Sequence, residues 1–172
     1  MEFNTRLCNP SDESALSLIA QGTSLETYAG FADGEDLVMH ANAESSVKVF
    51  SEIVRSEHMR AWIAETVIGR CPVGYAVAVA DGHDKSFASF ELKRLYVFHR
   101  FHTNGLGKRL MEDVLRFAKE RNSGKIWLEV QDSNAHAIQF YKRFGFVQTG
   151  VGLFPAGKGS YRVLIMELTL AG

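Results

Sequence analysis

Hydrophobic and polar positions alternate with two different periods along this chain. Residues 105–122 place Leu106, Leu110, Val114 and Phe117 on one helical face and charged residues on the other, which predicts an amphipathic helix. The same criteria predict further helices at 14–21, 35–40, 44–56 and 134–144. Runs rich in β-branched and aromatic residues predict strands at 3–8, 59–67, 73–80, 87–98, 125–130, 146–151 and 160–168.

The order of these elements indicates the class of fold. Turn residues, among them 68–70, separate three consecutive strands of an antiparallel meander, and helices and strands then alternate. In the first helix, Ala15, Leu18 and Ile19 are expected to face the core, and residues 22–34 are expected to break the helical pattern. The order predicts an α/β fold in which helices cover both faces of a mixed sheet.

Length and composition favour one folded domain over residues 1–172, because 46% hydrophobic residues suffice for a single core. The 19 basic and 20 acidic residues nearly cancel, which argues against nucleic-acid and membrane partners. Since no apolar run could span a bilayer, we expect a soluble, cytoplasmic protein. Cys8 and Cys71 are expected as reduced thiols in small core spaces. His99 and His102 have no further ligands at metal spacing, so no metal is expected.

The sharpest local feature is a pair of glycines at the start of the helix predicted at 105–122. Gly105 and Gly107 follow a strand and a short loop, and they lack the Cβ that would keep an anion away from the backbone. Unpaired N–H groups and the helix dipole favour a phosphate there. Arg109 stands where a P-loop requires Ser or Thr, which excludes a P-loop. Leu110 stands where a Rossmann fingerprint requires a small residue, which excludes that motif as well. A helix start without a ligand is the alternative.

A second pattern follows about thirty residues later, with the spacing N-x-x-A-x-x-F-Y-x-x-x-G-F formed by Asn134, Ala137, Phe140, Tyr141, Gly145 and Phe146. Together with His102, Gly105 and Gly107, spaced as R/Q-x-x-G-x-G, it resembles motifs A and B of the GNAT superfamily of acetyl-CoA-dependent N-acetyltransferases. The resemblance covers residues 87–168. It departs from the family where His102 replaces Gln or Arg and where Thr103 replaces Gly or Arg. It implies a mostly antiparallel central sheet of about six to seven strands.

The resemblance also implies that acetyl-CoA binds as the acyl donor. The residues it assigns to this cofactor are Leu95, Tyr96, Val97, His102, Thr103, Asn104, Gly105, Leu106, Gly107, Lys108, Asn134, Ala137 and Tyr141. Tyr141 would flank the CoA thiol and donate a proton to the departing thiolate; a tyrosine that only caps the core is the alternative for this residue alone. The reaction's oxyanion would bind a backbone N–H of residues 95–97, where the family breaks its ladder with a bulge.

An acceptor ammonium must lose a proton before its nitrogen can attack a thioester. Glu91 lies eleven residues before His102, where histone-acetyltransferase-like members carry their base, and its neighbours Phe87, Phe90 and Leu92 could raise its pKa by desolvation. A solvated strand carboxylate is the alternative for Glu91. Many relatives use a chain of water molecules instead, which leaves Glu65 and His136 as weaker candidates.

The family takes its acceptor specificity from two segments that correspond to residues 23–36 and 154–161 of this chain. The first carries acidic and aromatic side chains suited to a small cationic amine, and the second is interpreted as a mobile flap. We therefore expect Tyr28, Phe31 and Phe154 to bind the acceptor. The alternative for the first segment is a solvated loop with two aromatic residues in the core. The alternative for the second is an ordinary hairpin loop.

The sequence thus predicts an N-acetyltransferase that transfers an acetyl group from acetyl-CoA to a primary amine by direct attack in a ternary complex. Small amines, amino acids, antibiotic-like compounds and peptide amines all remain possible acceptors. A non-catalytic acyl-CoA-binding module and a protein acetyltransferase are the other hypotheses. A homodimer is possible, because dimerisation is common in the family.

Overall fold

The structure is a computed structural model that describes residues 1–30, 32–81, 89–156 and 158–170. Its strands are β1 (Phe3–Leu7), β2 (Met59–Thr66), β3 (Pro72–Asp81), β4 (Ser89–Val97), β5 (Lys125–Gln131), β6 (Val147–Ala156) and β7 (Gly159–Thr169). Its α-helices are α1 (Glu13–Tyr28), α2 (Gly34–Glu44), α3 (Val47–Arg55), α4 (Leu106–Glu120) and α5 (Ala135–Arg143). Two short 3₁₀ helices, η1 (Pro10–Asp12) and η2 (His99–Asn104), precede α1 and α4. No helix among these is long and apolar enough to cross a bilayer.

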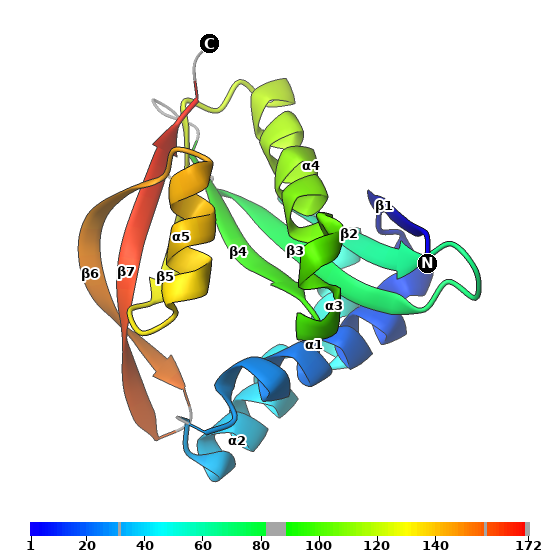
Figure 1. Cartoon of the computed structure of the whole chain (residues 1–172), viewed down its shortest axis with the longest axis horizontal. Helices are drawn as coiled ribbons and strands as arrows, with labels where there is room; N and C mark the ends of the chain where they lie inside the picture. Colours follow the sequence, from blue (N-terminus) through cyan, green and yellow to red (C-terminus); the bar gives the residue numbers. More distant parts are fainter. Residues whose placement is uncertain (31, 82–88, 157, 171–172) are drawn as a thin grey trace.

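The strands form one mixed sheet in the order β1-β2-β3-β4-β5-β7-β6. Every neighbouring pair is antiparallel except β4 and β5, which run parallel in the middle of the sheet (Figure 1). This confirms the mostly antiparallel sheet and the meander that the sequence predicts. The single parallel pair matters for function, because its connection carries the glycine-containing helix start.

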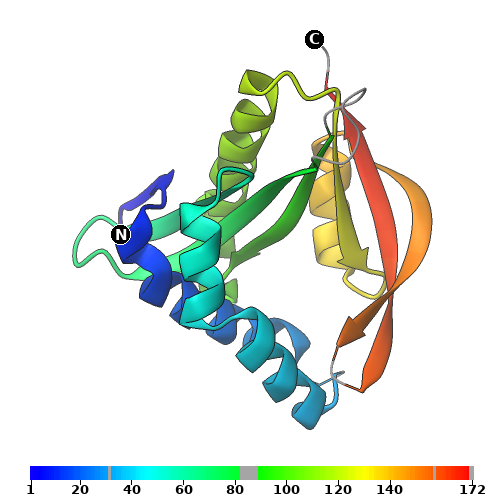
Figure 2. The same cartoon turned by 180° about the vertical axis from the view of Figure 1, so that it is seen from behind.

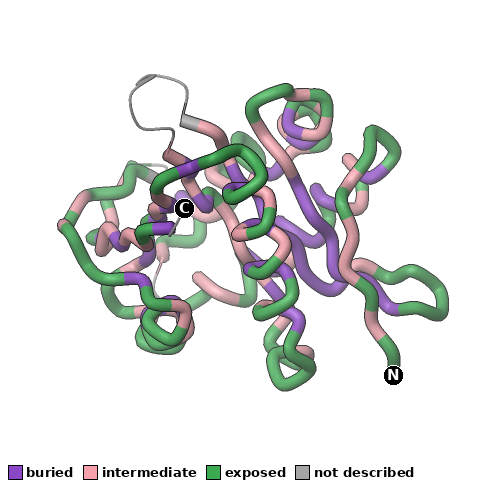
Figure 3. The backbone as a smooth tube through the Cα atoms, turned by 90° about the horizontal axis from the view of Figure 1, so that it is seen from above, coloured by how far each residue is buried: buried purple, intermediate pink, exposed green. Residues whose placement is uncertain are grey.

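Helices cover both faces of the sheet, as predicted. On one face α1 and α3 pack on β2 and β3, with Leu16, Ile19, Phe50, Tyr75 and Val77 in a shared apolar cluster. On the other face α4 and α5 build the larger cluster (Figures 1 and 2). Figure 3 shows buried positions along the strands and the inner helix faces, with exposed positions outside. The two clusters fix both helical layers against the central strands.

Helix α1 is longer than predicted, and it turns a different face to the core. Its buried apolar positions include Leu16 and Ile19, whereas Leu18 is 68% exposed. The expected break at Gly22 does not occur, because this glycine lies inside the helix against Phe98. A Cβ there would lie 2.7 Å from the Phe98 ring, so the packing of that ring requires the glycine. The buried Thr23 continues the helix by donating its hydroxyl to the Ile19 carbonyl.

The expected flap at 154–159 is largely a β-hairpin. Strand β6 runs on to Ala156, past the predicted end at 151, and Phe154 pairs with Tyr161 of β7. Gly157 lies outside the described residues. The hairpin is tied to α2, because the backbone N–H of Lys158 donates to Asp36 at 2.6 Å and its ammonium pairs with Glu35 at 3.1 Å. The described residues on both sides of Gly157 thus make strand and cross-element contacts where the glycines and the proline predicted a flap.

Candidate active site

The parallel strands β4 and β5 pair only at their first residues and then diverge. Ladder pairs join Ser89–Glu91 of β4 to Lys125–Trp127 of β5, while the strands continue to Val97 and Gln131 (Figure 1). A cavity of about 850 Å³ lies at this opening, between the diverging strands, α5 and the N-terminus of α4. The backbone groups that β4 turns toward β5 are thus left without a ladder partner beyond Glu91.

The N-terminus of α4 forms one end of this cavity. Gly105 adopts a left-handed conformation with φ of 71°, and no side chain caps the helix. The cavity lining includes Gly105, Gly107 and Lys108, and the first α-helical bond to Gly105 comes from Arg109. A Cβ on Gly107 would approach Phe140 at 3.5 Å, so this turn lies directly on α5. Uncapped N–H groups beside a lysine fit an anionic group such as a diphosphate.

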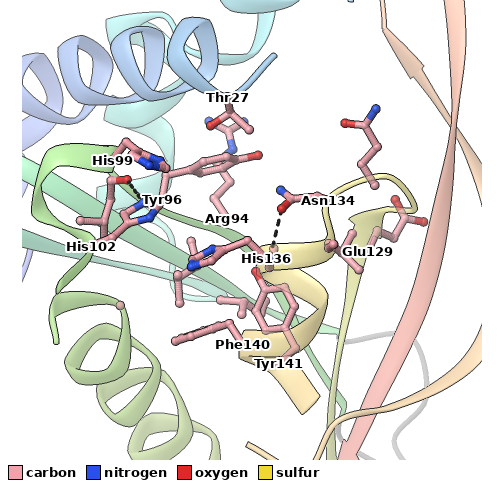
Figure 4. A pocket seen from close by; sticks show the side chains of 18 of the residues that line it. Thr27, Arg94, Tyr96, His99, His102, Glu129, Asn134, His136, Phe140 and Tyr141 are labelled. Carbon is pink, nitrogen blue, oxygen red and sulfur yellow. Dashed lines mark hydrogen bonds between the residues drawn. The ribbon is translucent and has the colours of Figure 1, made fainter. Parts of the chain in front are cut away.

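Three histidines stand side by side along the same wall (Figure 4). The ring of His102 lies 4.7 Å from that of His99 and 5.2 Å from that of His136, in a near-parallel stack with the latter. Its Nε2 is 2.8 Å from the Val97 carbonyl, so His102 joins the end of β4 to η2. Burial, and then the charges of His102 and Arg143, lower the pKa of His136. His136 is therefore neutral at neutral pH.

Tyr141 reaches the cavity from α5 and retains its proton. Only 8% of the residue is exposed, and burial together with the nearby Tyr96 raises the pKa of its phenol above the usual value. Figure 4 shows the hydroxyl directed into the cavity on the side of Asn134. Asn134 caps α5 by accepting the Ala137 N–H at 3.0 Å. A protonated phenol in this position can donate a hydrogen bond to a leaving thiolate.

A bulge in β4 decides which side chains reach the opposite face of the sheet. Its register against β3 shifts between Arg94 and Leu92, so Lys93 is an extra residue. Before the bulge Phe90 and Leu92 pack toward α4, and after it Arg94 takes the other face. The bulge thus precedes the predicted position at 95–97, where pairing with β3 is regular.

A second cavity, of about 620 Å³, lies on the α1 and α2 side of the sheet. It meets the first at the opening between β4 and β5, because both are lined by Tyr28, Leu92, Lys93, Arg94, Tyr96, Glu129 and Gln131. The hydroxyls of Tyr28 and Tyr96 are 2.8 Å apart at this junction. The adjacent Tyr96 and burial raise the pKa of Tyr28, which keeps this hydroxyl neutral.

The predicted acceptor residues converge on the second cavity. Its lining includes Tyr28, Glu91 and Phe154, and Phe154 lies edge-on to His40 with 5.7 Å between ring centroids. Phe31 and Phe87 lie outside the described residues. The acidic side chains predicted for this region are largely engaged elsewhere: Glu26 accepts the His99 N–H, Asp33 caps α2, and Glu35 and Asp36 bind Lys158.

Of the predicted cofactor residues, ten line the first cavity and three do not. The ten are Leu95, Tyr96, Val97, His102, Gly105, Gly107, Lys108, Asn134, Ala137 and Tyr141. Leu106 is fully buried in the core, the Asn104 side chain donates to the Phe101 carbonyl, and Thr103 is exposed. Thr103 and Asn104 belong to the 3₁₀ helix η2, where the sequence predicts a loop, and Leu106 is the first residue of α4.

Two other expectations are wrong. Glu65 lies in neither cavity lining; it is buried on β2, where it pairs with Arg6 at 3.1 Å and Arg70 at 3.2 Å. Burial opposes its ionisation, but these arginines lower its pKa overall, so Glu65 is a structural carboxylate. Cys71 is exposed and does not fill the core. No cluster of His, Cys, Asp or Glu that could hold a metal occurs within the described part of the chain.

The sequence-based interpretation overlooked Arg94 and Gln131, both of which line the junction of the two cavities. A signal for Arg94 existed: alternation of apolar residues holds at Phe90 and Leu92, then resumes out of phase at Leu95 and Val97. Such a phase change within one strand is typical of a bulge. For Gln131 the sequence holds no comparable signal, because its place depends on how far β5 diverges.

Fold and site together are those of an acyltransferase of the type that the two motifs predict. A family model described as the Acetyltransferase (GNAT) family matches residues 28–146, and this chain belongs to that family.

Similar proteins agree with this assignment. An uncharacterized N-acetyltransferase of Mycobacterium tuberculosis is 31% identical over 123 residues, which cover 72% of this chain and 75% of the relative. A [ribosomal protein bS18]-alanine N-acetyltransferase of Salmonella typhimurium is 33% identical over 73 residues, 41% of this chain and 49% of that enzyme. The PaiA N-acetyltransferase of Thermoplasma acidophilum, crystallised with coenzyme A, shares the fold with a TM-score of 0.81 at 22% identity, over 99% of this chain and 100% of that one.

Proposed function

We propose that this chain transfers an acetyl group from acetyl-CoA to a primary amine by direct attack in a ternary complex. One observation carries the proposal: two cavities on opposite faces of the sheet meet where β4 and β5 diverge. A donor can thus enter from the α4 and α5 side and an acceptor from the α1 and α2 side. Their reacting groups then meet at the junction without either having to leave.

The first cavity suits acetyl-CoA. The uncapped N–H groups at Gly105 and Gly107, with Lys108, would hold the diphosphate. The unpaired backbone groups of β4 beyond Glu91 would bind the pantetheine arm, and an N–H among residues 95–97 would stabilise the oxyanion. With the pantetheine arm bound in this way, the thioester would lie beside Tyr141.

An ammonium acceptor must lose two protons on its way to the amide, and one proton must reach the sulfur. Glu91, which lines the acceptor cavity, would take a proton from the ammonium directly or through water. The amine nitrogen then bonds to the thioester carbon, and the carbon–sulfur bond breaks. Tyr141, whose raised pKa keeps it protonated, would donate to the sulfur, and the second proton of the attacking nitrogen would then restore the Tyr141 phenol directly or through water. The relatives leave the identity of the acceptor open, although one of them is named as an N-acetyltransferase of an alanine in a ribosomal protein.

Release of free thiol from acetyl-CoA with a panel of small amines, amino acids, aminoglycosides and an alanine-terminated peptide tests this proposal. We expect turnover with at least one acceptor, and Tyr141→Phe should lower kcat by about one to three decades while CoA still binds in a calorimeter. The phenyl ring preserves the contacts with Phe140 and Phe146, so the fold should be unaffected. CoA binding without turnover would favour a regulatory module, and an unchanged rate would remove Tyr141 from the mechanism.

A further inference from the structure

Two buried polar atoms lack hydrogen-bond partners among the described residues, and both belong to the junction of the cavities. They are Nη1 of Arg94 and Oε1 of Gln131. Buried donors and acceptors are almost always paired in folded proteins, so each exception calls for an explanation. A missing ligand explains both atoms at once, because one is a donor and the other an acceptor.

The guanidinium of Arg94 forms a hydrogen bond through Nη2 but none through Nη1 within the part of the chain that the structure describes. Its side chain is only 10% exposed, and Nη2 donates to Glu44 at 3.2 Å. The guanidinium lies over the Phe50 ring, 5.3 Å from the centroid. The charge of Arg94 and its proximity to the Tyr75 hydroxyl offset part of the rise in pKa that burial causes at Tyr75. Nη1 still forms no hydrogen bond among the described residues. Arg94 is thus a positioned cation with donor capacity to spare.

Four carboxylates line the second cavity together with Arg94 and Gln131. Asp36 is bound by Lys158 and Glu44 by Arg94, so both of these carboxylates already have partners. Glu91 and Glu129 add negative charge to the same lining. An acceptor with an ammonium and an anionic oxygen matches such a cavity, because the carboxylates attract its nitrogen and the guanidinium attracts its oxygen.

We propose that Arg94 binds a carboxylate of the acceptor and that the Gln131 carboxamide accepts a hydrogen bond from the acceptor's nitrogen. The acceptor class is therefore an amine that carries a carboxylate close to the nitrogen, such as an amino acid. This inference rests on the proposed function. Both orphaned atoms are covered by protein, so the ligand binds with a small rotation of the two side chains that exposes them.

Three acceptors that share one side chain test the inference: an α-amino acid, its carboxamide and the alkylamine that lacks the carboxyl carbon. We expect wild-type kcat/KM, measured by thiol release, to favour the acid by about 10- to 100-fold. Arg94→Gln should abolish this preference, because it should lower kcat/KM for the acid far more than for the alkylamine. Arg60→Gln is the matched control, because Arg60 also lies over a phenylalanine, 5.5 Å from the Phe117 centroid, yet lines neither cavity. It should retain the preference.

Equal use of the three acceptors by the wild-type protein would overturn the inference without touching the proposed function. An equal loss for all three in Arg94→Gln, with Arg60→Gln unaffected, would also overturn it. A binding measurement covers the case in which no acceptor turns over or the variant does not fold. The N-acetylated acid and its carboxamide are titrated into wild-type protein loaded with CoA. Tighter binding of the acid supports a carboxylate site even if catalysis fails, and equal affinity refutes it.

Discussion

Replacement of Gly105 by alanine separates the role of this glycine in the fold from its role in anion binding. Gly105 has φ of 71°, a left-handed conformation that costs an L-residue about 1–2 kcal/mol. The lower entropy of the unfolded alanine chain offsets up to about 1 kcal/mol. The net loss in the free energy of unfolding should be about 1 kcal/mol, or about 2–4 °C in Tm for a chain of this size.

Gly69 provides a matched control for this backbone cost. It has φ of 82° in the turn between β2 and β3, and an added Cβ meets no atom within 4 Å at either glycine. Only Gly105 lines the cavity between β4 and β5. A methyl group there would obstruct the N–H groups that are proposed to bind the diphosphate, and the loss of one charge-assisted hydrogen bond costs about 1.5–3 kcal/mol. The Kd for CoA should therefore rise about 10- to 100-fold in Gly105→Ala and stay unchanged in Gly69→Ala.

Thermal unfolding and isothermal titration calorimetry with CoA measure the two effects on the same samples. Equal losses in Tm with different affinities would support the assignment of the helix N-terminus as the diphosphate site. If Gly105→Ala bound CoA within about twofold of Gly69→Ala, the diphosphate would have to lie elsewhere. The placement of the thioester beside Tyr141 would then lose its basis.

Two further predictions concern stability and thiol chemistry. Arg6 joins Asp12 at 2.7 Å and Glu65 at 3.1 Å, so Arg6→Met should cost about 3 kcal/mol at pH 7, because Asp12 loses its ion-pair partner and Glu65 keeps only Arg70. Because Arg6 lowers the pKa of Asp12 in the folded state, this stabilisation is present above the unfolded pKa of about 4 and is lost as the pH falls through the folded pKa. Denaturant unfolding measures the free energy of unfolding of both proteins, and an equal difference between them at pH 7 and pH 2 would contradict this prediction. Burial raises the pKa of Cys8 to about 12, so a disulfide reagent should modify the exposed Cys71 quickly and Cys8 only after unfolding, and rapid reaction of two thiols in the folded protein would disprove this.

Much of the site could be predicted because it depends on short-range pattern. The helix after Gly105 has an apolar face that any amphipathic helix would bury, and its start carries the uncapped N–H groups wherever the helix lies. The segment from Asn134 to Phe146 likewise folds as its spacing predicts, with Asn134 as the cap and Tyr141 on the buried face.

The expectations that failed depend on partners distant in the sequence. Gly22 predicts a helix break from its own conformational freedom, yet the ring of Phe98, from beyond β4, fills the space beside it and the helix continues. Glu65 is a possible base by residue type, and only its pairing with Arg6 makes it structural. The segment after Phe154 has the composition of a loop, but its described residues pair with β7 and, through Lys158, contact Asp36.

The sequence by itself determined the periodic elements, the glycine helix start and the Asn134 and Tyr141 helix, because each follows from interactions within a few residues. Only the tertiary structure decided where β4 and β5 part and which residues meet there. The bulge at Lys93 turns Arg94 to the side of the second cavity, and the divergence of the strands brings it to the same opening as Gln131. Such placements depend on the register between strands, which non-local packing sets and local sequence does not encode.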